Sequence, residues 1–466
     1  MTTPLGAPAP ALSVAAEGRP RRDLTQGSLG RWLAALSLPA AAESLLFNAT
    51  GLSNALWLGQ VSGTALSAAV LGTSLRIVLI SPMMGLSTGG MAVVANHVGA
   101  REQDLANRAV MQTLLLVLAA VLPLAALGLL MGRTFLGWMG ASGEVLEEAV
   151  QFVTVIFWGL VFMEVLPTMN AVIKGAGHPQ ATLRISIVHI LIWLTLEPLL
   201  VRGVGPLPAM GVRGSAWAAV LASAAGVAAQ MVTLLRGTAG VRLQWRHLRP
   251  DWGMLRRILR IAAPTMAQRF SPNMAEALML RLVSAFGDQV LSGYSLATRL
   301  IGFMRGVYMG ISTASTTLVG QNQGAGRPER SERAALLGAV SAAGLSAGLL
   351  AVMATYAVPL LTLLEERPDI IAGAAGILYY MIAVIAGQGW LLVMTGALSA
   401  AGDAVAAMWI NVLAVWGLQL PLAWALSQGL GLGPAGLWVG MGIAAVLAAV
   451  VVTWRFRGGQ WKARAV

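Results

Sequence analysis

Two stretches without a charged residue, 334–364 and 370–402, restrict this chain more than any other feature of its sequence. Each is longer than the roughly 20 apolar residues that an α-helix needs to cross a bilayer. Only 11% of the 466 residues are charged, whereas a soluble domain carries about 25%. We therefore predict an all-α membrane protein.

Charged residues and Gly- or Pro-rich turns divide the apolar sequence into twelve predicted transmembrane helices. The predicted ranges are 31–58, 64–93, 106–133, 145–172, 180–201, 211–236, 255–284, 289–318, 331–363, 370–397, 404–427 and 434–455.

The sequence also repeats itself. VANHVGA at 94–100 returns as VGQNQGA at 319–325, at an offset of 225, and the same offset pairs Pro39 with Pro264 and Met84 with Met309. Each repeat holds six predicted helices, so both halves enter the membrane in the same direction. We expect two six-helix lobes related by a pseudo-two-fold axis along the membrane normal.

The predicted organisation has five parts. They are a cytosolic N-terminal tail at 1–30, an N-lobe at 31–236, a cytosolic inter-lobe linker at 237–254, a C-lobe at 255–456 and a cytosolic C-terminal tail at 457–466. Of the 31 Lys and Arg residues, 22 fall in predicted inner segments or helix ends and four in outer ones. This bias places both termini in the cytosol of a bacterial inner membrane. Because topology explains much of the net charge of +12, we expect no nucleic-acid partner.

The chain has no cysteine, which excludes disulfides, thiolate metal sites and cysteine nucleophiles. No HExxH pattern, GxSxG pattern or His/Cys cluster stands in a context suited to catalysis or metal binding. We therefore predict no enzyme, no cofactor and no metal site.

Four of the nineteen acidic residues fall well inside predicted helices: Glu43, Glu164, Glu197 and Glu276. A carboxylate in hydrocarbon is costly, so such a residue usually faces protein, water or a partner and is a functional candidate. The remaining fifteen acids lie in loops, tails or first helical turns, where solvated charges are ordinary.

Several motifs occur in an order and spacing that resemble one transporter family. They are the two prolines Pro39 and Pro264 at the predicted helix starts, the doubled VANHVGA and VGQNQGA loops, GVRG at 211–214, GPAG at 433–436 and LEPL at 196–199. With them the chain resembles the multidrug and toxic compound extrusion (MATE) family, in particular its DinF-like bacterial branch. The resemblance implies a membrane antiporter in which sodium or proton entry drives export of bulky, often cationic, amphipathic compounds from a central cavity.

From the resemblance and the acids together, Glu197 is the first candidate for ion coupling. The family pattern Asn-x-x-x-Asp-Pro reads here as Trp193, Glu197 and the following proline. An acid shielded from water can take up and release a proton near neutral pH. Asn54 stands where the family has an aspartate on the first helix, and Phe152 stands where it has a tyrosine. Of the two acids that the family pattern places at these positions, only the one at Glu197 is present.

Glu164 is a second coupling candidate, because it falls near mid-bilayer ten residues before Lys174; recognition of a cationic substrate is the alternative role. Glu276 lies about one turn before Met279, the repeat mate of Asn54, and is a candidate for substrate or ion binding. The predicted substrate cavity is lined by Glu276, Trp193, Phe152 and Met279.

Two further pairs carry predictions. Pro39 and Pro264 are predicted helix hinges. Glu43 maps by the offset to one residue before Arg269, so the two could form a cytoplasmic latch across the lobes. The alternative is that each finds a polar partner inside its own lobe.

Other functions remain open at this level. Protons are favoured over sodium because a lone Glu197 needs one exchangeable site, whereas sodium needs several oxygen ligands. A flippase for a lipid-linked sugar or other amphipathic lipid would instead need a strongly cationic cavity, and a non-transporting scaffold would show no polar residues converging between the lobes. We expect a monomer that meets a small organic substrate and membrane lipids.

Overall fold

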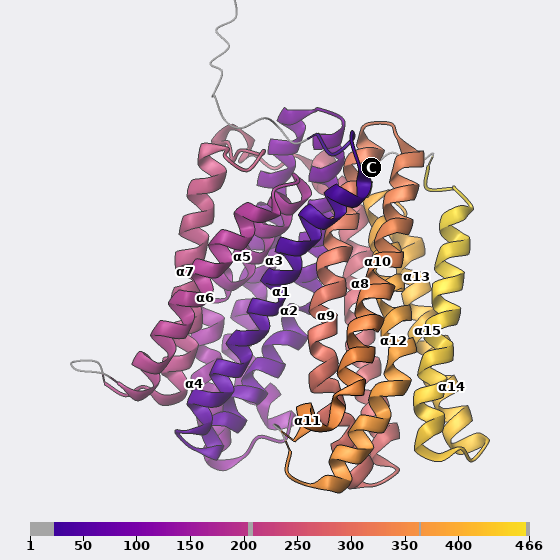
Figure 1. Cartoon of the computed structure of the whole chain (residues 1–466). Coiled ribbons are helices and arrows are strands. Elements are labelled where there is room, and N and C mark those ends of the chain that lie inside the picture. Colours follow the sequence, from indigo (N-terminus) through magenta and orange to yellow (C-terminus); the bar gives the residue numbers. More distant parts are fainter. Residues whose placement is uncertain (1–22, 204–207, 363–364, 463–466) are drawn as a thin grey trace, which may run out of the picture.

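The computed structural model describes residues 23–203, 208–362 and 365–462 of the chain. Every regular element in these ranges is a helix, and the long helices lie side by side (Figure 1). The N-lobe consists of α1 (Leu29–Gly59), α2 (Gly63–Gly99), α3 (Gln103–Trp138), α4 (Gly143–Trp158), α5 (Leu160–Gly175), α6 (Pro179–Arg202) and α7 (Gly211–Arg236).

The C-lobe follows a linker that contains the short 3₁₀ helix η1 (Trp245–His247). It consists of α8 (Trp252–Ser284), α9 (Asp288–Gly324), α10 (Pro328–Thr355), α11 (Ala357–Leu361), α12 (Pro368–Ala400), α13 (Ala404–Val412), α14 (Leu420–Trp424) and α15 (Gly433–Arg457). Helices occupy all twelve predicted ranges. The predicted all-α, multi-span fold class is confirmed.

Three predicted helices are interrupted, and the one predicted at 331–363 is divided at Tyr356 into α10 and α11. The helix predicted at 145–172 is the pair α4 and α5, which meet at Gly159 with a bend of 52°. A Cβ atom at Gly159 would lie 2.3 Å from the Val220 side chain of α7, so the bend brings this backbone close against α7. The helix predicted at 404–427 contains π-helical stretches, Leu413–Gln419 and Ala425–Gly429, on either side of Pro421. Proline lacks the N–H that regular α-helical bonding needs.

Eight of the helices in the described ranges are long and apolar enough to cross a membrane, and the bent α4–α5 pair raises the number to nine. The three remaining predicted spans are α1, α8 and α9. All three pack across the boundary between the lobes, α1 on α9 and α8 on α2. Helices that face another lobe need less apolar surface than helices that face lipid, and α8 carries six charged residues.

Glycines of the two repeats bring the lobes into close contact in matched pairs. A Cβ atom at Gly99 would lie 1.9 Å from the backbone oxygen of Gln321, and one at Gly324 would lie 1.9 Å from the backbone oxygen of Asn96. Gly99 and Gly324 are repeat mates at the offset of 225, and so are Asn96 and Gln321. The repeated loops found in the sequence therefore meet each other across the pseudo-two-fold axis.

A short N-terminal arm, residues 23–28, precedes α1 but lies against the C-lobe. Arg327 Nη1 donates to the Thr25 carbonyl over 2.7 Å, and Arg330 Nη2 donates to the Gly27 carbonyl over 2.8 Å. Leu24 of this arm is buried. The segment that leads into the first lobe is thus held by the second.

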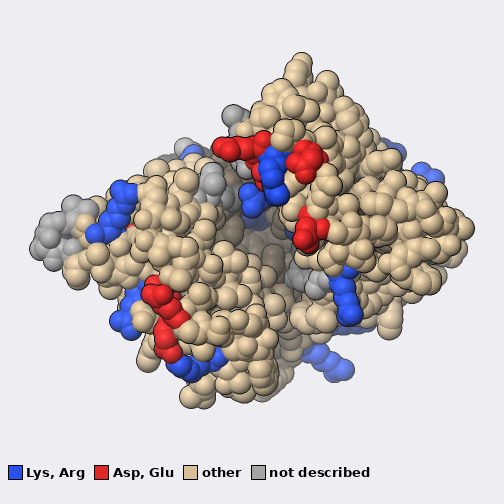
Figure 2. Space-filling model, turned by 90° about the horizontal axis from the view of Figure 1, so that it is seen from below, with Lys and Arg blue, Asp and Glu red and all other residues tan. Residues whose placement is uncertain are grey.

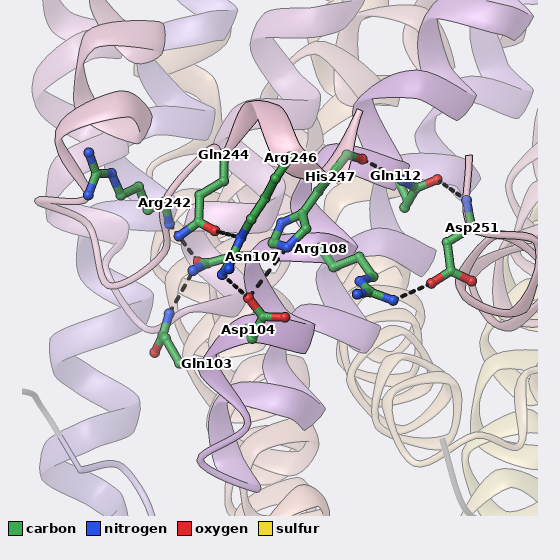
Figure 3. A network of polar contacts seen from close by, with 10 residues as sticks. All are labelled: Gln103, Asp104, Asn107, Arg108, Gln112, Arg242, Gln244, Arg246, His247 and Asp251. Atoms are coloured by element: carbon green, nitrogen blue, oxygen red, sulfur yellow. Dashed lines mark hydrogen bonds and ion pairs between the residues drawn. The ribbon is translucent and has the colours of Figure 1, made fainter. Parts of the chain in front are cut away.

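The inter-lobe linker is held in the reciprocal way, because it precedes α8 but lies on α3 of the N-lobe (Figure 3). Gln112 Nε2 donates to the His247 carbonyl over 2.7 Å, and Gln112 Oε1 accepts from the Asp251 N–H over 3.0 Å. Arg108 pairs with Asp251 at 2.7 Å, while the other oxygen of Asp251 caps α8 by accepting from the Met254 N–H over 3.1 Å. One carboxylate therefore joins the start of the C-lobe to the N-lobe.

Candidate ion-coupling and substrate site

Glu197 of α6 is fully buried, and its carboxylate receives hydrogen bonds from two other helices. Ser53 Oγ of α1 donates to Oε2 over 2.6 Å, and Ser215 Oγ of α7 donates to Oε1 over 2.7 Å. Asn54 Nδ2 lies 3.2 Å from Oε1 and 2.6 Å from Ser215 Oγ. The donors found in the described part of the chain are all neutral.

The local sequence allows this arrangement. Gly214 precedes Ser215, and a Cβ atom there would lie 2.4 Å from the Leu200 carbonyl oxygen of α6. A larger residue would therefore separate α7 from α6 and withdraw the Ser215 hydroxyl from the carboxylate. Pro198, directly after Glu197, lies inside α6 and removes one backbone N–H from the helix at the site.

The structure brings together two of the residues singled out in the sequence, Glu197 and Asn54, and it adds two that were missed. Ser53 and Ser215 gave no signal of their own, because isolated serines are common in transmembrane helices. The indole nitrogen of Trp193, one turn before Glu197, is buried near the carboxylate without a well-aligned hydrogen bond. The expected single titratable residue therefore sits among three side chains that carry oxygen.

Glu164 of α5 belongs to a separate contact. Its Oε1 atom lies 3.3 Å from Arg76 Nη1 of α2, and both side chains are largely buried. A buried ion pair is stable only while both partners are present. The contacts among the described residues do not join Glu164 to Glu197, so the two acids lie in separate networks in this conformation.

Glu43 finds its partners inside the N-lobe. Lys174 Nζ of α5 lies 2.9 Å from Oε2, Thr182 Oγ1 of α6 donates to Oε2 over 3.1 Å, and Asn170 Nδ2 of α5 donates to Oε1 over 3.2 Å. This matches the intralobe alternative for Glu43. The side chain of Arg269, its predicted latch partner, lies outside the described residues.

A polar cavity of about 120 Å³ lies between the lobes. Its only charged lining residue among those described is Lys174, which Glu43 pairs. The other lining residues are polar or apolar and come from both lobes: Thr88, Met91, Ala171, Thr265, Gln268, Met309, Ser312, Thr313, Thr316, Leu392, Gly396 and Ser399. Polar side chains of the two lobes therefore converge at their boundary.

The face opposite the C terminus is hollowed at its centre, and acidic and basic residues stand at the rim of the hollow (Figure 2). The end that carries the C terminus and the linker is instead closed by the contacts of Gly99 and Gly324. The molecule is thus open between its lobes at one end and sealed at the other.

The four predicted cavity residues do not share one environment. Phe152 is packed in the N-lobe core against Gly72, and Met279 is buried in the core of the C-lobe. In this conformation neither lies on the described inter-lobe cavity. Trp193 is half-buried beside Glu197, whereas Glu276 is exposed on α8, where Arg305 of α9 lies within electrostatic range.

The two predicted hinge prolines lie inside helices and not at helix starts. α1 begins at Leu29, ten residues before Pro39, and α8 begins at Trp252, twelve residues before Pro264. The two prolines therefore do not mark helix starts, and α1 and α8 begin only two and three residues before the predicted 31 and 255. An internal proline weakens a helix locally. We therefore propose that α1 and α8 bend at Pro39 and Pro264.

A two-lobed, many-helix bundle with an inter-lobe cavity is the architecture of a secondary carrier. A family model described as MatE matches residues 39–199 and 264–425, segments that begin at the repeat mates Pro39 and Pro264 and together make up more than half of the chain. The chain belongs to the MatE (MATE) family. This family consists of transporters and not of enzymes.

Among curated proteins, the chain is 24% identical over 432 residues to "Probable multidrug resistance protein NorM" of Geobacillus kaustophilus, covering 92% of this chain and 95% of that protein. It is 23% identical over 433 residues to "Uncharacterized transporter YisQ" of Bacillus subtilis, covering 92% and 94%.

Among solved structures, the fold is similar to one titled "Outward-facing conformation of a multidrug resistance MATE family transporter of the MOP superfamily", with a TM-score of 0.88, 20% identity and coverage of 96% of this chain and all of that one. It is also similar to a MOP superfamily transporter from Pyrococcus furiosus, with a TM-score of 0.87, 21% identity and coverage of 95% and 98%. These likenesses establish the shared fold.

Proposed function

We propose that the chain is an antiporter that exports organic, cationic amphipathic compounds in exchange for protons by alternating access of its two lobes. Membership of the MATE family and relatives named for multidrug resistance support this assignment. The hollow at one end and the closed glycine contacts at the other are what one state of an alternating carrier requires.

The observation that carries the proposal is the buried Glu197 carboxylate with its neutral donors from α1 and α7. When charged, it accepts from Ser53, Ser215 and Asn54. When protonated, it must donate, and a serine hydroxyl can turn to accept. Proton uptake therefore changes the contacts between α1, α6 and α7, which gives a route from ion binding to helix movement.

Sodium is the second candidate for the coupling ion, because several oxygen-bearing side chains surround the carboxylate. The hydroxyls of Ser53 and Ser215, the amide oxygen of Asn54 and the two oxygens of Glu197 offer the hard ligands that such a cation prefers. Imposed proton and sodium gradients distinguish the two ions.

For the substrate, we propose that Glu276 receives the positive charge. It is exposed on α8, and among the described residues it makes no hydrogen bond or ion pair. A carrier of lipid-linked pyrophosphates would need a strongly cationic cavity. The inter-lobe cavity instead holds Lys174 neutralised by Glu43, which supports export of organic cations over lipid flipping.

The proposal extends to topology and classification. The Lys and Arg bias supports a cytosolic location of the end that carries the linker, in a bacterial inner membrane, so that the hollow of Figure 2 faces outward. We further propose the predicted lobe and linker boundaries, a monomeric carrier, the DinF-like branch, and a role in ion coupling for Glu164.

The test is uptake of a fluorescent organic cation into proteoliposomes under an imposed proton or sodium gradient. Glu197→Gln, which removes the charge and keeps the shape, should abolish gradient-driven transport, and Glu276→Gln should weaken the apparent affinity for the cation. Glu144→Gln, at an exposed acid in the first turn of α4, is the matched control. Transport by Glu197→Gln at the wild-type rate would exclude the coupling role.

A further inference from the structure

A basic groove of about 840 Å³ lies apart from the coupling and substrate site, at the end of the molecule that carries the linker. Its walls are Leu116 of α3, the first three turns of α8, and Gly402 in the turn between α12 and α13. The groove therefore touches both lobes at the level where α8 enters the membrane.

Three arginines of α8 line this groove: Arg256, Arg257 and Arg260. Arg257 Nη1 lies 3.0 Å from His97 Nε2 of α2, and His97 Nδ1 lies 2.6 Å from Glu102. Arg257 can only donate a hydrogen bond, so His97 Nε2 accepts it and Nδ1 carries the ring proton that points to Glu102. These two hydrogen bonds fix the position of Arg257. Within the described ranges, Arg256 and Arg260 are exposed and make no hydrogen bond or ion pair.

The acids near the groove are already paired. Asp251, at the start of α8, pairs with Arg108 at 2.7 Å. Asp403, next to Gly402, is buried and pairs with Arg455 at 2.5 Å. The groove consequently presents positive charge that no described protein carboxylate neutralises, and a ligand that complements it must be anionic.

The groove is also partly apolar and lies at the membrane boundary. Trp252, Arg256 and Arg260 follow at intervals of four residues and so share one face of α8, and Trp252 is 80% exposed. Exposed tryptophans of this kind settle at the level of lipid head groups. Leu116 and Leu255 add aliphatic walls, which a free phosphate would not use.

We propose that this groove binds the head group of an anionic phospholipid, with Arg256 and Arg260 holding the phosphate and the aliphatic walls receiving the start of the acyl chains. Basic pockets between transmembrane helices on the cytosolic side are suited to such head groups. The lipid bridges α3 of the N-lobe and the α12–α13 turn of the C-lobe. The proposal goes beyond ion coupling and does not depend on which ion is used.

The test uses the full chain in a neutral detergent, titrated into phosphatidylglycerol labelled on an acyl chain and followed by fluorescence anisotropy. Unlabelled phosphatidylglycerol, phosphatidylcholine and glycerol 3-phosphate serve as competitors. The double variant Arg256→Gln/Arg260→Gln should bind about 30-fold more weakly, the factor expected for losing two basic contacts to an anionic lipid. The charge-preserving pair Arg256→Lys/Arg260→Lys should retain most of the binding.

The matched control is Arg184→Gln/Arg249→Gln, which makes the same change of net charge at two exposed arginines outside the groove. It should change binding less than threefold, and phosphatidylcholine and glycerol 3-phosphate should compete poorly. Equal losses in the two double variants would overturn the site in favour of general surface attraction. Competition by glycerol 3-phosphate as strong as that by the lipid would overturn the lipid assignment in favour of a soluble phosphate. If Arg256→Lys/Arg260→Lys lost binding while its melting temperature stayed unchanged, the proposal that positive charge at these two positions holds the lipid phosphate would be overturned.

Discussion

The contact between the repeated loops leads to a sharp prediction about Gly324→Ala. The new Cβ atom would lie 1.9 Å from the Asn96 oxygen, and contacts of this kind are essentially never shorter than 3.0 Å. The two backbones must therefore separate by at least about 1 Å, or the lobes must part. Neither side of the contact is a flexible side-chain end that could simply turn away.

The cost follows from overpacking, which is typically about 1–3 kcal/mol. Because the strain exists only while this end of the molecule is closed, the substitution should favour the opposite state about 5- to 150-fold. Gly99→Ala meets the Gln321 oxygen at the same 1.9 Å, so symmetry predicts an effect of the same size. Gly344→Ala is the control, because a Cβ atom there meets nothing within 4 Å.

The absence of native cysteine allows a direct assay. Thr317 of α9 is buried and donates to the Lys174 carbonyl of the N-lobe over 3.1 Å, so Thr317→Cys places a reporter thiol inside the closed boundary. Its rate of maleimide labelling should rise about 5- to 150-fold with Gly324→Ala and stay unchanged with Gly344→Ala. An unchanged rate with Gly324→Ala in a folded, transport-competent protein would refute the account of the seal.

Removing one member of a buried ion pair should cost more than removing both. Arg76→Gln should lower the free energy of unfolding by roughly 3 kcal/mol, and adding Glu164→Gln should recover at least half of this in thermal melts; additive losses would contradict the pairing. The backbone N–H groups at the start of α8 and a nearby arginine hold the pKa of Asp251 below its usual 3.8. The stability it provides is thus present above pH 3.8 and lost as the pH falls through the lowered value, so Asp251→Asn should lower the melting temperature at about pH 7 but not at about pH 2; an equal decrease at both would exclude this origin. Asn54→Asp puts a second carboxylate where Asn54 Nδ2 now lies 3.2 Å from Glu197, so the pH profile of transport should move upward by about one unit or more, and an unmoved profile would show that the two sites do not interact.

The fold could be predicted from the sequence because the sequence features that indicate it are either local or repeated. Long charge-free stretches predict spans by themselves, and the offset of 225 predicts which helices correspond. The structure extends this with the reciprocal contacts of Gly99 with Gln321 and of Gly324 with Asn96. The bend at Gly159 was not predicted, since a lone glycine in an apolar run is usual in transmembrane helices.

The candidate site was accessible only in part. Glu197 and Asn54 could be named because one is an acid in an apolar helix and both fall at positions marked by a family resemblance. Ser53 could not be named, since it lies 144 residues from Glu197 and shares no pattern with it. Likewise, Arg76 and Glu164 are 88 residues apart, and only the three-dimensional arrangement makes them partners.

The N-terminal arm and the linker have a consequence for the origin of the molecule, because each leads into one lobe and is bound by the other. A half-length ancestor with one such arm would have laid it on a second copy and received that copy's arm in return, closing as an exchanged homodimer before gene fusion. The two halves, produced as separate polypeptides in one cell, should accordingly recognise each other through these arms and reassemble.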